Sequence, residues 1–260
     1  FNLNMVFLCS MPRAGNTLLG SIINQNEKIK LTSNSIMLDV LESLNQLKES
    51  IIFKNFPDHN SLDNLIKSSF LMYYKDWKAD LIIDRGPWGT PTSLNNIKKI
   101  IKKPKFIILY RPIQECLASF GKLLSEDKNF NEDMNKFLFN LMDEERGYIG
   151  KALRSINNLI ENKEDYKIFY YKDLVNDPNL FLKNLSEYIG YDIKFNFKTL
   201  KQFHINDVYY NDSVALKNLH KINTNSIEKN VYKVENYLTN DIIKYLEEKG
   251  MERISNKNDE

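Results

Sequence analysis

The sequence contains only two cysteines among 260 residues, Cys9 and Cys116, which are too few for a disulfide framework and favour a reducing compartment. It also lacks a strong excess of charge, because 36 Lys and Arg residues stand against 34 Asp and Glu residues, for a net charge of +2. Domains that bind nucleic acid usually have a marked basic footprint. We therefore expect no nucleic-acid partner.

Long apolar runs are missing as well. The longest, such as Phe106-Ile-Ile-Leu-Tyr110, are far too short to span a bilayer, and no signal peptide is evident. We expect no membrane partner for this chain and a cytoplasmic location. Phe1 is not an initiator methionine, so the question of an upstream leader or anchor stays open.

What the sequence does have is four short runs rich in Val, Ile, Phe and Tyr, at 6–9, 81–84, 106–110 and 167–171. They are apolar on both faces and alternate with helical periodicity, which is typical of a parallel sheet buried between helices. We predict a three-layer α/β fold and, from the length, one domain over residues 1–260. The segment 192–219 has weak periodicity. Helices are expected near 17–25, 36–51, 61–77, 91–102, 113–125, 132–161, 179–189 and 240–249.

The segment after the first run has the features of an anion site. Ser10-Met-Pro-Arg-Ala-Gly-Asn-Thr-Leu-Leu-Gly20 leads from a strand through a tight loop into a helix, whose first amides and dipole favour negative charge. Gly15 permits the turn, and Arg13 can bind a phosphate or sulfate. Asn16 and Thr17 are expected to cap the helix with their side chains. The alternative is an ordinary strand-to-helix turn.

A second candidate phosphate site follows the run that ends at Tyr110. Arg111 falls at the carboxyl end of that predicted strand, where open parallel sheets bind ligands. Ser119 lies about two turns into the next helix, so the two residues could meet around one phosphate if the ligand lies along that helix. The alternative is a solvated arginine.

These two motifs resemble those of the PAPS-dependent sulfotransferases, which use 3′-phosphoadenosine 5′-phosphosulfate (PAPS) as donor. Pro12-Arg-Ala-Gly-Asn-Thr-Leu-Leu19 is similar to the family's 5′-phosphosulfate loop, Pro-(Arg/Lys)-Ser-Gly-Thr-Thr followed by an apolar pair, with Ala14 and Asn16 as departures. Arg111 and Ser119 resemble its 3′-phosphate site. The resemblance implies a P-loop-like fold, nearest in motif to the protein-tyrosine and phage-type branch. It implies that the nucleotide is bound by Arg13, Ala14, Gly15, Asn16, Thr17, Leu18, Arg111 and Ser119.

Two later segments extend the resemblance. Phe169-Tyr-Tyr-Lys-Asp-Leu-Val-Asn-Asp-Pro178 is similar to the family's Tyr-Glu-Asp-Leu stretch and implies that Tyr171 closes over the nucleotide. Leu219-His-Lys-Ile222 lies where the protein-tyrosine and phage-type members carry a phosphate-binding lysine, which makes Lys221 the candidate. A packing tyrosine and a surface lysine are the simpler alternatives.

The chemical centre is expected at Leu81-Ile-Ile-Asp-Arg-Gly-Pro-Trp88, which resembles the family's Asp-Lys-x-Pro motif. Arg85, in the lysine's place, can neutralise developing charge, with Arg13 of the loop as a second catalytic cation, but it cannot donate a proton. Asp84 is a candidate base, or it orients Arg85 or caps local amides. The glutamate base of the protein-tyrosine branch aligns with Asn34, which cannot take a proton. Asp39 and His204 therefore stay alternative bases.

The sequence thus predicts a sulfotransferase that moves a sulfuryl group from PAPS to a hydroxyl or amine. No HExxH, CxxC or paired-carboxylate motif occurs, so we expect no metal. One alternative is a P-loop kinase or nucleotide triphosphatase, although the loop lacks the Walker A glycine and lysine. The other is a non-catalytic relative that binds a bisphosphate nucleotide. The acceptor stays open among small molecules, sugars, lipids and peptides, as does the oligomeric state.

Overall fold

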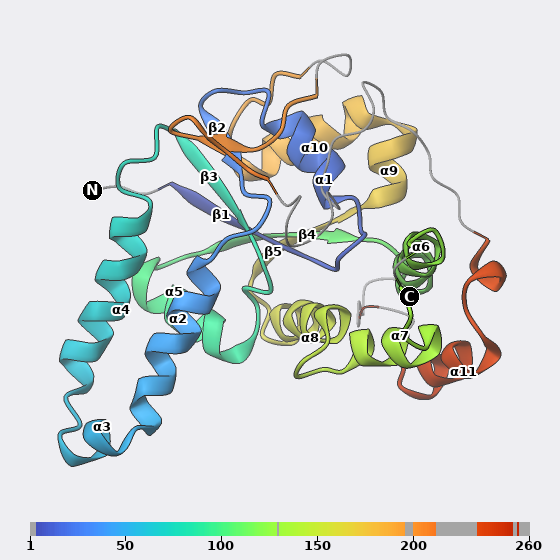
Figure 1. The fold of residues 1–260 in the computed structure, drawn as a ribbon. Helices are drawn as coiled ribbons and strands as arrows, with labels where there is room; N and C mark the ends of the chain where they lie inside the picture. The colour runs from blue at the N-terminus through green and yellow to red at the C-terminus, as the bar shows by residue number, and fades with distance from the viewer. Residues whose placement is uncertain (1–3, 129, 196–199, 212–232, 252–253, 255–260) are drawn as a thin grey trace.

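A five-stranded parallel sheet runs through the centre of the structure (Figure 1). The computed structural model describes residues 4–128, 130–195, 200–211, 233–251 and 254. Neighbouring strands in the order β2-β3-β1-β4-β5 pair in parallel, so their carboxyl ends all lie along one edge of the sheet. The strands are β1 (Met5–Ser10), β2 (Ile29–Leu31), β3 (Leu81–Arg85), β4 (Lys105–Tyr110) and β5 (Asp165–Tyr170).

Helices cover both faces of this sheet, which confirms the predicted three-layer α/β fold. The core on one face includes residues of α1 (Asn16–Ile23), α9 (Tyr171–Asn176) and α10 (Pro178–Ile189). The core on the other face includes residues of α2 (Met37–Gln46), α4 (His59–Tyr73), α5 (Pro91–Ile100), α6 (Ile113–Ser125), α7 (Met134–Met142), α8 (Tyr148–Glu161) and α11 (Asn240–Glu248).

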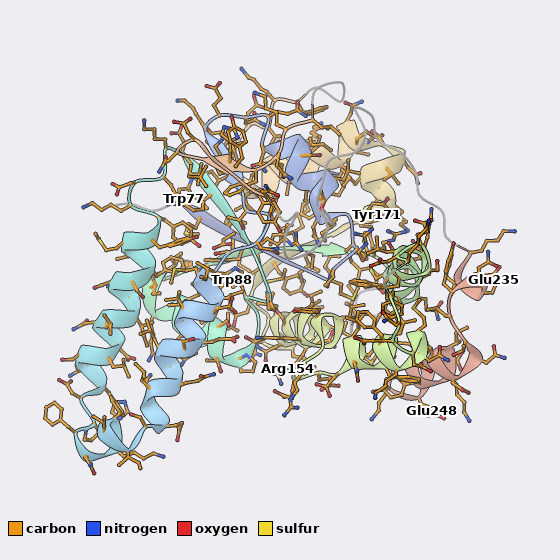
Figure 2. The ribbon with its side chains drawn as sticks, in the orientation of Figure 1. Trp77, Trp88, Arg154, Tyr171, Glu235 and Glu248 are labelled. Atoms are coloured by element: carbon orange, nitrogen blue, oxygen red, sulfur yellow. The ribbon has the colours of Figure 1, made fainter. Side chains whose placement is uncertain are left out.

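Strand β1 shows how the sequence builds both cores. Its residues alternate between faces, as a strand period of two requires, so Val6 and Leu8 enter the core beneath α1 while Phe7 enters the other. The Phe7 ring lies 4.9 Å from that of Trp88 and 5.6 Å from that of Phe106, centroid to centroid. Figure 2 shows Trp88 between the sheet and the helices on that side. The central strand is therefore fixed from both sides.

The structure departs from the expected helices and strands in several places. The single helix expected over 132–161 is two helices, because the Asp143 carboxylate accepts hydrogen bonds from the NH groups of Glu145 and Arg146 and so forms a turn. The three-residue strand β2 was not expected. The weakly periodic segment 192–219 contains, in its described part, a hairpin of β6 (His204–Ile205) and β7 (Val208–Tyr209).

Helices α2 and α4 extend away from the sheet as a hairpin that also contains η1 (Leu47–Glu49) and α3 (Ile51–Asn55) (Figure 1). At its tip Ile51, Ile52 and Phe56 are 77, 83 and 75% exposed. No helix within the described ranges is long and apolar enough to cross a membrane. The remaining described element is η2 (Val234–Asn236), which precedes α11.

Replacing Phe7 with alanine should destabilise the protein strongly, because its fully buried ring fills the space between Trp88 and Phe106. Removing a buried phenyl ring usually costs about 3–5 kcal/mol. Urea unfolding should show this loss for Phe7→Ala, whereas Phe56→Ala, at the exposed tip, should stay within about 0.5 kcal/mol of wild type. Equal stabilities for the two variants would contradict the assignment of the core.

Candidate active site

The loop between β1 and α1, residues 11–15, is a tight turn at the carboxyl edge of the sheet. The NH group of the buried Ala14 donates to the carbonyl of Met11 at 3.2 Å, so this NH group is hydrogen-bonded within the turn itself. Arg13 has a φ of 67° and Gly15 a φ of 98°. Left-handed backbone is ordinary for glycine but uncommon for arginine, and such strain concentrates at ligand sites. Among the described residues no side chain caps α1, so its first amides are placed where helices commonly bind anions.

Asn16 fastens the loop instead of capping the helix, which corrects the expectation that the side chains of Asn16 and Thr17 act as caps. Its Nδ2 donates to the Met11 carbonyl at 2.9 Å, and its Oδ1 accepts from the Ser10 hydroxyl. The side chain is turned back into the loop, and Asn16 is only 5% exposed. Its predicted contact with a ligand would therefore come from its backbone. Thr17 and Leu18 follow in the first turn, and both are partly exposed.

Arg13, Arg111 and Ser119, which the sequence assigns to two phosphate sites, lie together in the structure. The Nε of Arg13 donates to the Ser119 hydroxyl at 3.1 Å, and the Nη1 of Arg111 donates to the Arg13 carbonyl at 3.1 Å. Strands β1 and β4 are neighbours, with Ser10 beside Leu109, so the segments that follow them meet at the carboxyl edge. The two predicted phosphate sites therefore form one continuous cationic region.

Glu115 and Tyr171 hold the Arg111 side chain in place. The Nε of Arg111 donates to the Glu115 carboxylate at 2.9 Å, and its guanidinium carbon lies 4.4 Å from the centroid of the Tyr171 ring. The same ring packs against Gly15, where an added Cβ would lie 2.4 Å from the Tyr171 Cδ2. Tyr171 sits near α1 and α6 in Figure 2. It thus joins the loop after β1 to the arginine after β4.

The carboxyl group of Asp84 lies inside the protein, at the end of β3. Asp84 has no exposed surface; its Oδ1 accepts from the Thr32 hydroxyl at 2.8 Å, and its Oδ2 accepts from the Tyr74 hydroxyl. Burial raises the pKa of Asp84 from 3.8 to about 6, against the opposing effect of these hydrogen bonds. A buried carboxyl group whose two oxygens are both engaged favours a structural role over that of a base for an external acceptor.

Arg85 follows Asp84 in the strand, and the two side chains point to opposite faces of the sheet. The NH group of Arg85 donates to the Thr32 hydroxyl at 2.9 Å, and its Nη1 donates to the Ser33 carbonyl at 2.7 Å. Burial lowers the pKa of Arg85 to about 10, while the negative charge of an ionised Tyr210 has the opposite effect. Thr32 links the two residues, because its hydroxyl donates to Asp84 and accepts from Arg85.

Asn34, which stands where the base would align, contacts a tyrosine. Its Nδ2 donates to the Tyr210 hydroxyl at 2.9 Å. Of the alternative bases, Asp39 is exposed in the first turn of α2, and the His204 ring stacks on that of Tyr209 at a centroid distance of 5.0 Å. The structure therefore brings Tyr210, rather than either of these groups, against Asn34.

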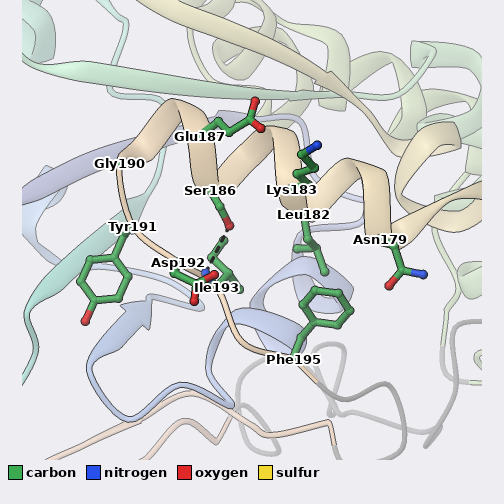
Figure 3. Close-up of a pocket in the computed structure, with 10 residues that line it drawn as sticks. All are labelled: Asn179, Leu182, Lys183, Ser186, Glu187, Gly190, Tyr191, Asp192, Ile193 and Phe195. Carbon is green, nitrogen blue, oxygen red and sulfur yellow. Dashed lines mark hydrogen bonds between the residues drawn. The ribbon is translucent and has the colours of Figure 1, made fainter.

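A cavity of about 490 Å³ lies along α10, and its lining includes none of the predicted site residues (Figure 3). It is bounded by one side of α10 and by residues 190–195, where the NH group of Ile193 donates to the Ser186 hydroxyl at 3.2 Å. Lys221 falls outside the described residues, so its role stays a prediction. Within the described part of the chain, His, Cys, Asp and Glu side chains form no group of three that could hold a metal ion.

Four residues of this region were missed by the sequence analysis: Thr32, Tyr74, Glu115 and Tyr210. Glu115 had a signal, since it stands four residues after Arg111, a spacing that often pairs opposite charges. Tyr210 also had a sequence signal, because Asn206 and Asp207 are suited to the two-residue turn of a hairpin and Tyr210 follows shortly after them. Both turn residues have positive φ in the structure. Thr32 and Tyr74 carry no local signal, because only the folded sheet brings them to Asp84.

Comparison with known proteins identifies relatives of the chain. A family model described as "Sulfotransferase family" matches residues 5–195. A search of curated proteins finds no match. Among solved structures, mouse sulfotransferase SULT7A1 complexed with PAP has a TM-score of 0.59 and 17% identity, over 98% of this chain and 86% of that one.

Two bacterial structures show the same fold with similarly low sequence identity. The sulfotransferase domain of the Synechococcus PCC 7002 olefin synthase has a TM-score of 0.50 and 19% identity, over 81% of this chain and 82% of that one. A sulfotransferase from Alicyclobacillus acidocaldarius has a TM-score of 0.50 and 12% identity, over 75% of this chain and 83% of that one. At such identities the likeness establishes the arrangement of elements.

Asp84→Asn should remove a pH dependence of stability. The folded protein binds the Asp84 proton more tightly than the unfolded chain does, because the pKa is about 6 in the fold against 3.8. Wild-type stability should therefore fall as the pH rises from about 4 to about 6, by at most roughly 3 kcal/mol. Urea unfolding across that range should show wild type losing stability relative to Asp84→Asn. Parallel profiles would contradict this, and the exposed-site control Asp39→Asn should follow wild type.

Proposed function

This chain belongs to the sulfotransferase family, and from that premise we propose that PAPS is its sulfuryl donor and a hydroxyl or amine its acceptor. The observation that carries the choice of donor is the continuity of the Arg13 loop with Arg111 and Ser119. A nucleotide phosphorylated at both its 3′ and 5′ positions needs two adjoining anion sites, whereas a triphosphate does not. A mouse sulfotransferase of the same fold forms a complex with PAP, which supports the same donor class.

In this proposal the Arg13 loop and the first amides of α1 hold the 5′-phosphosulfate, while Arg111 and Ser119 hold the 3′-phosphate. Arg111 is suited to an anion because its charge is permanent and its planar fork can bind two oxygens. Glu115 orients that fork, and the ring of Tyr171 covers the region between the two anion sites. Lys221 stays the proposed additional phosphate ligand.

The transfer itself needs correct alignment and a cation near the group that gains charge. Arg85 is proposed for that task, since it ends the strand beside β1 and its guanidinium is held by the Ser33 carbonyl. Arg13 assists from the loop. Asp84 is proposed as a positioning residue: it holds Thr32, and the Thr32 hydroxyl holds the backbone of Arg85.

Two other functions compete with this one. A P-loop kinase or triphosphatase would need a lysine where Asn16 stands, yet the Asn16 side chain is engaged with Ser10 and Met11 inside the loop. A non-catalytic relative would bind the bisphosphate nucleotide and transfer nothing. It is favoured only by the presence of Asn34 where a glutamate base would align. Turnover of PAPS separates this alternative from the proposed enzyme.

PAP, the adenosine 3′,5′-bisphosphate that remains when PAPS has given up its sulfuryl group, should stabilise the protein more than ATP with Mg²⁺ does. The reason is that PAP offers phosphates to both halves of the cationic region, whereas ATP offers none to Arg111 and Ser119. A ligand at about 100 times its Kd adds about 2.7 kcal/mol, which a thermal melt detects easily. An equal or larger shift in Tm with ATP would contradict the proposed donor.

Arg111→Ala should weaken binding of PAP far more than binding of adenosine 5′-phosphosulfate, which has no 3′-phosphate. Loss of a charged hydrogen bond costs roughly 1.5–3 kcal/mol, or about a tenfold to hundredfold rise in Kd. Calorimetry with both ligands measures the difference, and Arg146→Ala, which removes an exposed arginine, is the matched control. The same loss for both ligands would remove Arg111 from the 3′-phosphate site.

A further inference from the structure

The hairpin of β6 and β7 is fastened to two segments, helix α1 and the loop between α4 and β3. The NH group of Lys201, just before it, donates to the Ser21 carbonyl in α1 at 3.1 Å. The Nδ2 of Asn206, at its turn, donates to the Asp76 carbonyl beyond α4 at 3.1 Å. The ring of Phe203 lies 5.9 Å from that of Trp77. The hairpin is therefore held between α1 and the loop that leads into β3.

This anchoring brings the hydroxyl of Tyr210 to the segment that follows β2. Tyr209, the last residue of β7, is 64% exposed and stacks on His204. Tyr210 follows β7, and its hydroxyl accepts a hydrogen bond from the Nδ2 of Asn34 at 2.9 Å. Tyr210 is half-buried. A phenol oxygen thus occupies a fixed position on the site side of the hairpin.

The same segment holds the proposed catalytic cation. Arg85 donates to the carbonyl of Ser33, the residue before Asn34, whose side chain donates to the Tyr210 hydroxyl. Arg85 pairs with Leu8 of β1, and parallel neighbours lie about 4.8 Å apart. The anion loop begins just beyond Ser10. The hydroxyl of Tyr210 therefore lies against the segment that holds Arg85, and the strand of Arg85 is the neighbour of the strand that leads into the loop.

We propose that Tyr210 is itself a sulfuryl acceptor, so that the enzyme sulfates its own hairpin. This inference rests on PAPS being the donor. The Tyr210 Oη forms a bond to the sulfur of PAPS, and the bond between that sulfur and the 5′-phosphate oxygen breaks. The electron pair stays on the phosphate, PAP leaves, and the phenol proton passes to water at the exposed Asn34. The sulfate ester is then held beside Arg85, an opposite charge.

The test is to incubate the purified protein with PAPS labelled with ³⁵S, without any added acceptor, and to map the labelled peptide by mass spectrometry. We expect one sulfuryl group per chain, on Tyr210. Tyr210→Phe should abolish the label, whereas Tyr209→Phe, a change of the same size one residue away, should keep it. Arg85→Ala should slow labelling by about 10²-fold, the usual effect of removing a group that stabilises transition-state charge.

Three outcomes would overturn the inference. They are the absence of label, label on a residue other than Tyr210, and a labelling rate per molecule that rises with protein concentration, since transfer within one chain does not. Melting with PAP, run on the same samples, keeps this inference apart from the proposed donor. If PAP raises the Tm but no label is found, only the self-sulfation proposal is wrong. If PAP leaves the Tm unchanged and no label is found, the proposed donor is wrong as well. Tyr210→Phe must show the wild-type shift with PAP, so that lost labelling is not lost folding.

Discussion

The contacts of the buried Arg111 guanidinium are the interaction on which the proposed nucleotide side of the site depends. Moving a cation out of water is unfavourable unless partners replace the lost hydration. Glu115, the Arg13 carbonyl and the Tyr171 ring are those partners, and they come from α6, the loop after β1 and the start of α9. Because one charge requires all three contacts, these segments are fixed relative to one another before a ligand binds. The site is therefore preorganised, which lowers the cost of binding.

The proposed acceptor side is built differently: two consecutive residues at the end of β3 point to opposite faces of the sheet. Asp84 turns into the core and bonds Tyr74 and Thr32, while Arg85 turns to the other face and bonds Ser33. The Thr32 hydroxyl couples the two, since it also receives the NH group of Arg85. A polar network inside the core thus fixes the backbone of Arg85.

Sequence patterns predicted the sheet, the tight loop between β1 and α1 and the family because these depend on local periodicity and on residues close together in the chain. They did not predict what the side chains at strand ends touch. Asn16 turns back into its loop because Ser10 and Met11 offer it partners. Asp84 is buried because Tyr74 and Thr32 reach it from other elements. Tyr210 comes to Asn34 only through a hairpin anchored elsewhere. Contacts of this kind exist only once distant segments have folded together.

The strand order also determines when this protein can fold during synthesis. Strand β1 emerges from the ribosome before the other strands of the sheet, but its hydrogen-bonding partners are residues 82–85 and 105–109. Until β4 has emerged, the apolar side chains of Phe7 and Leu8 have no complete sheet to join. A nascent chain in that state exposes surface that chaperones bind. The anion loop next to β1 gains its order later still, when translation has passed Arg111.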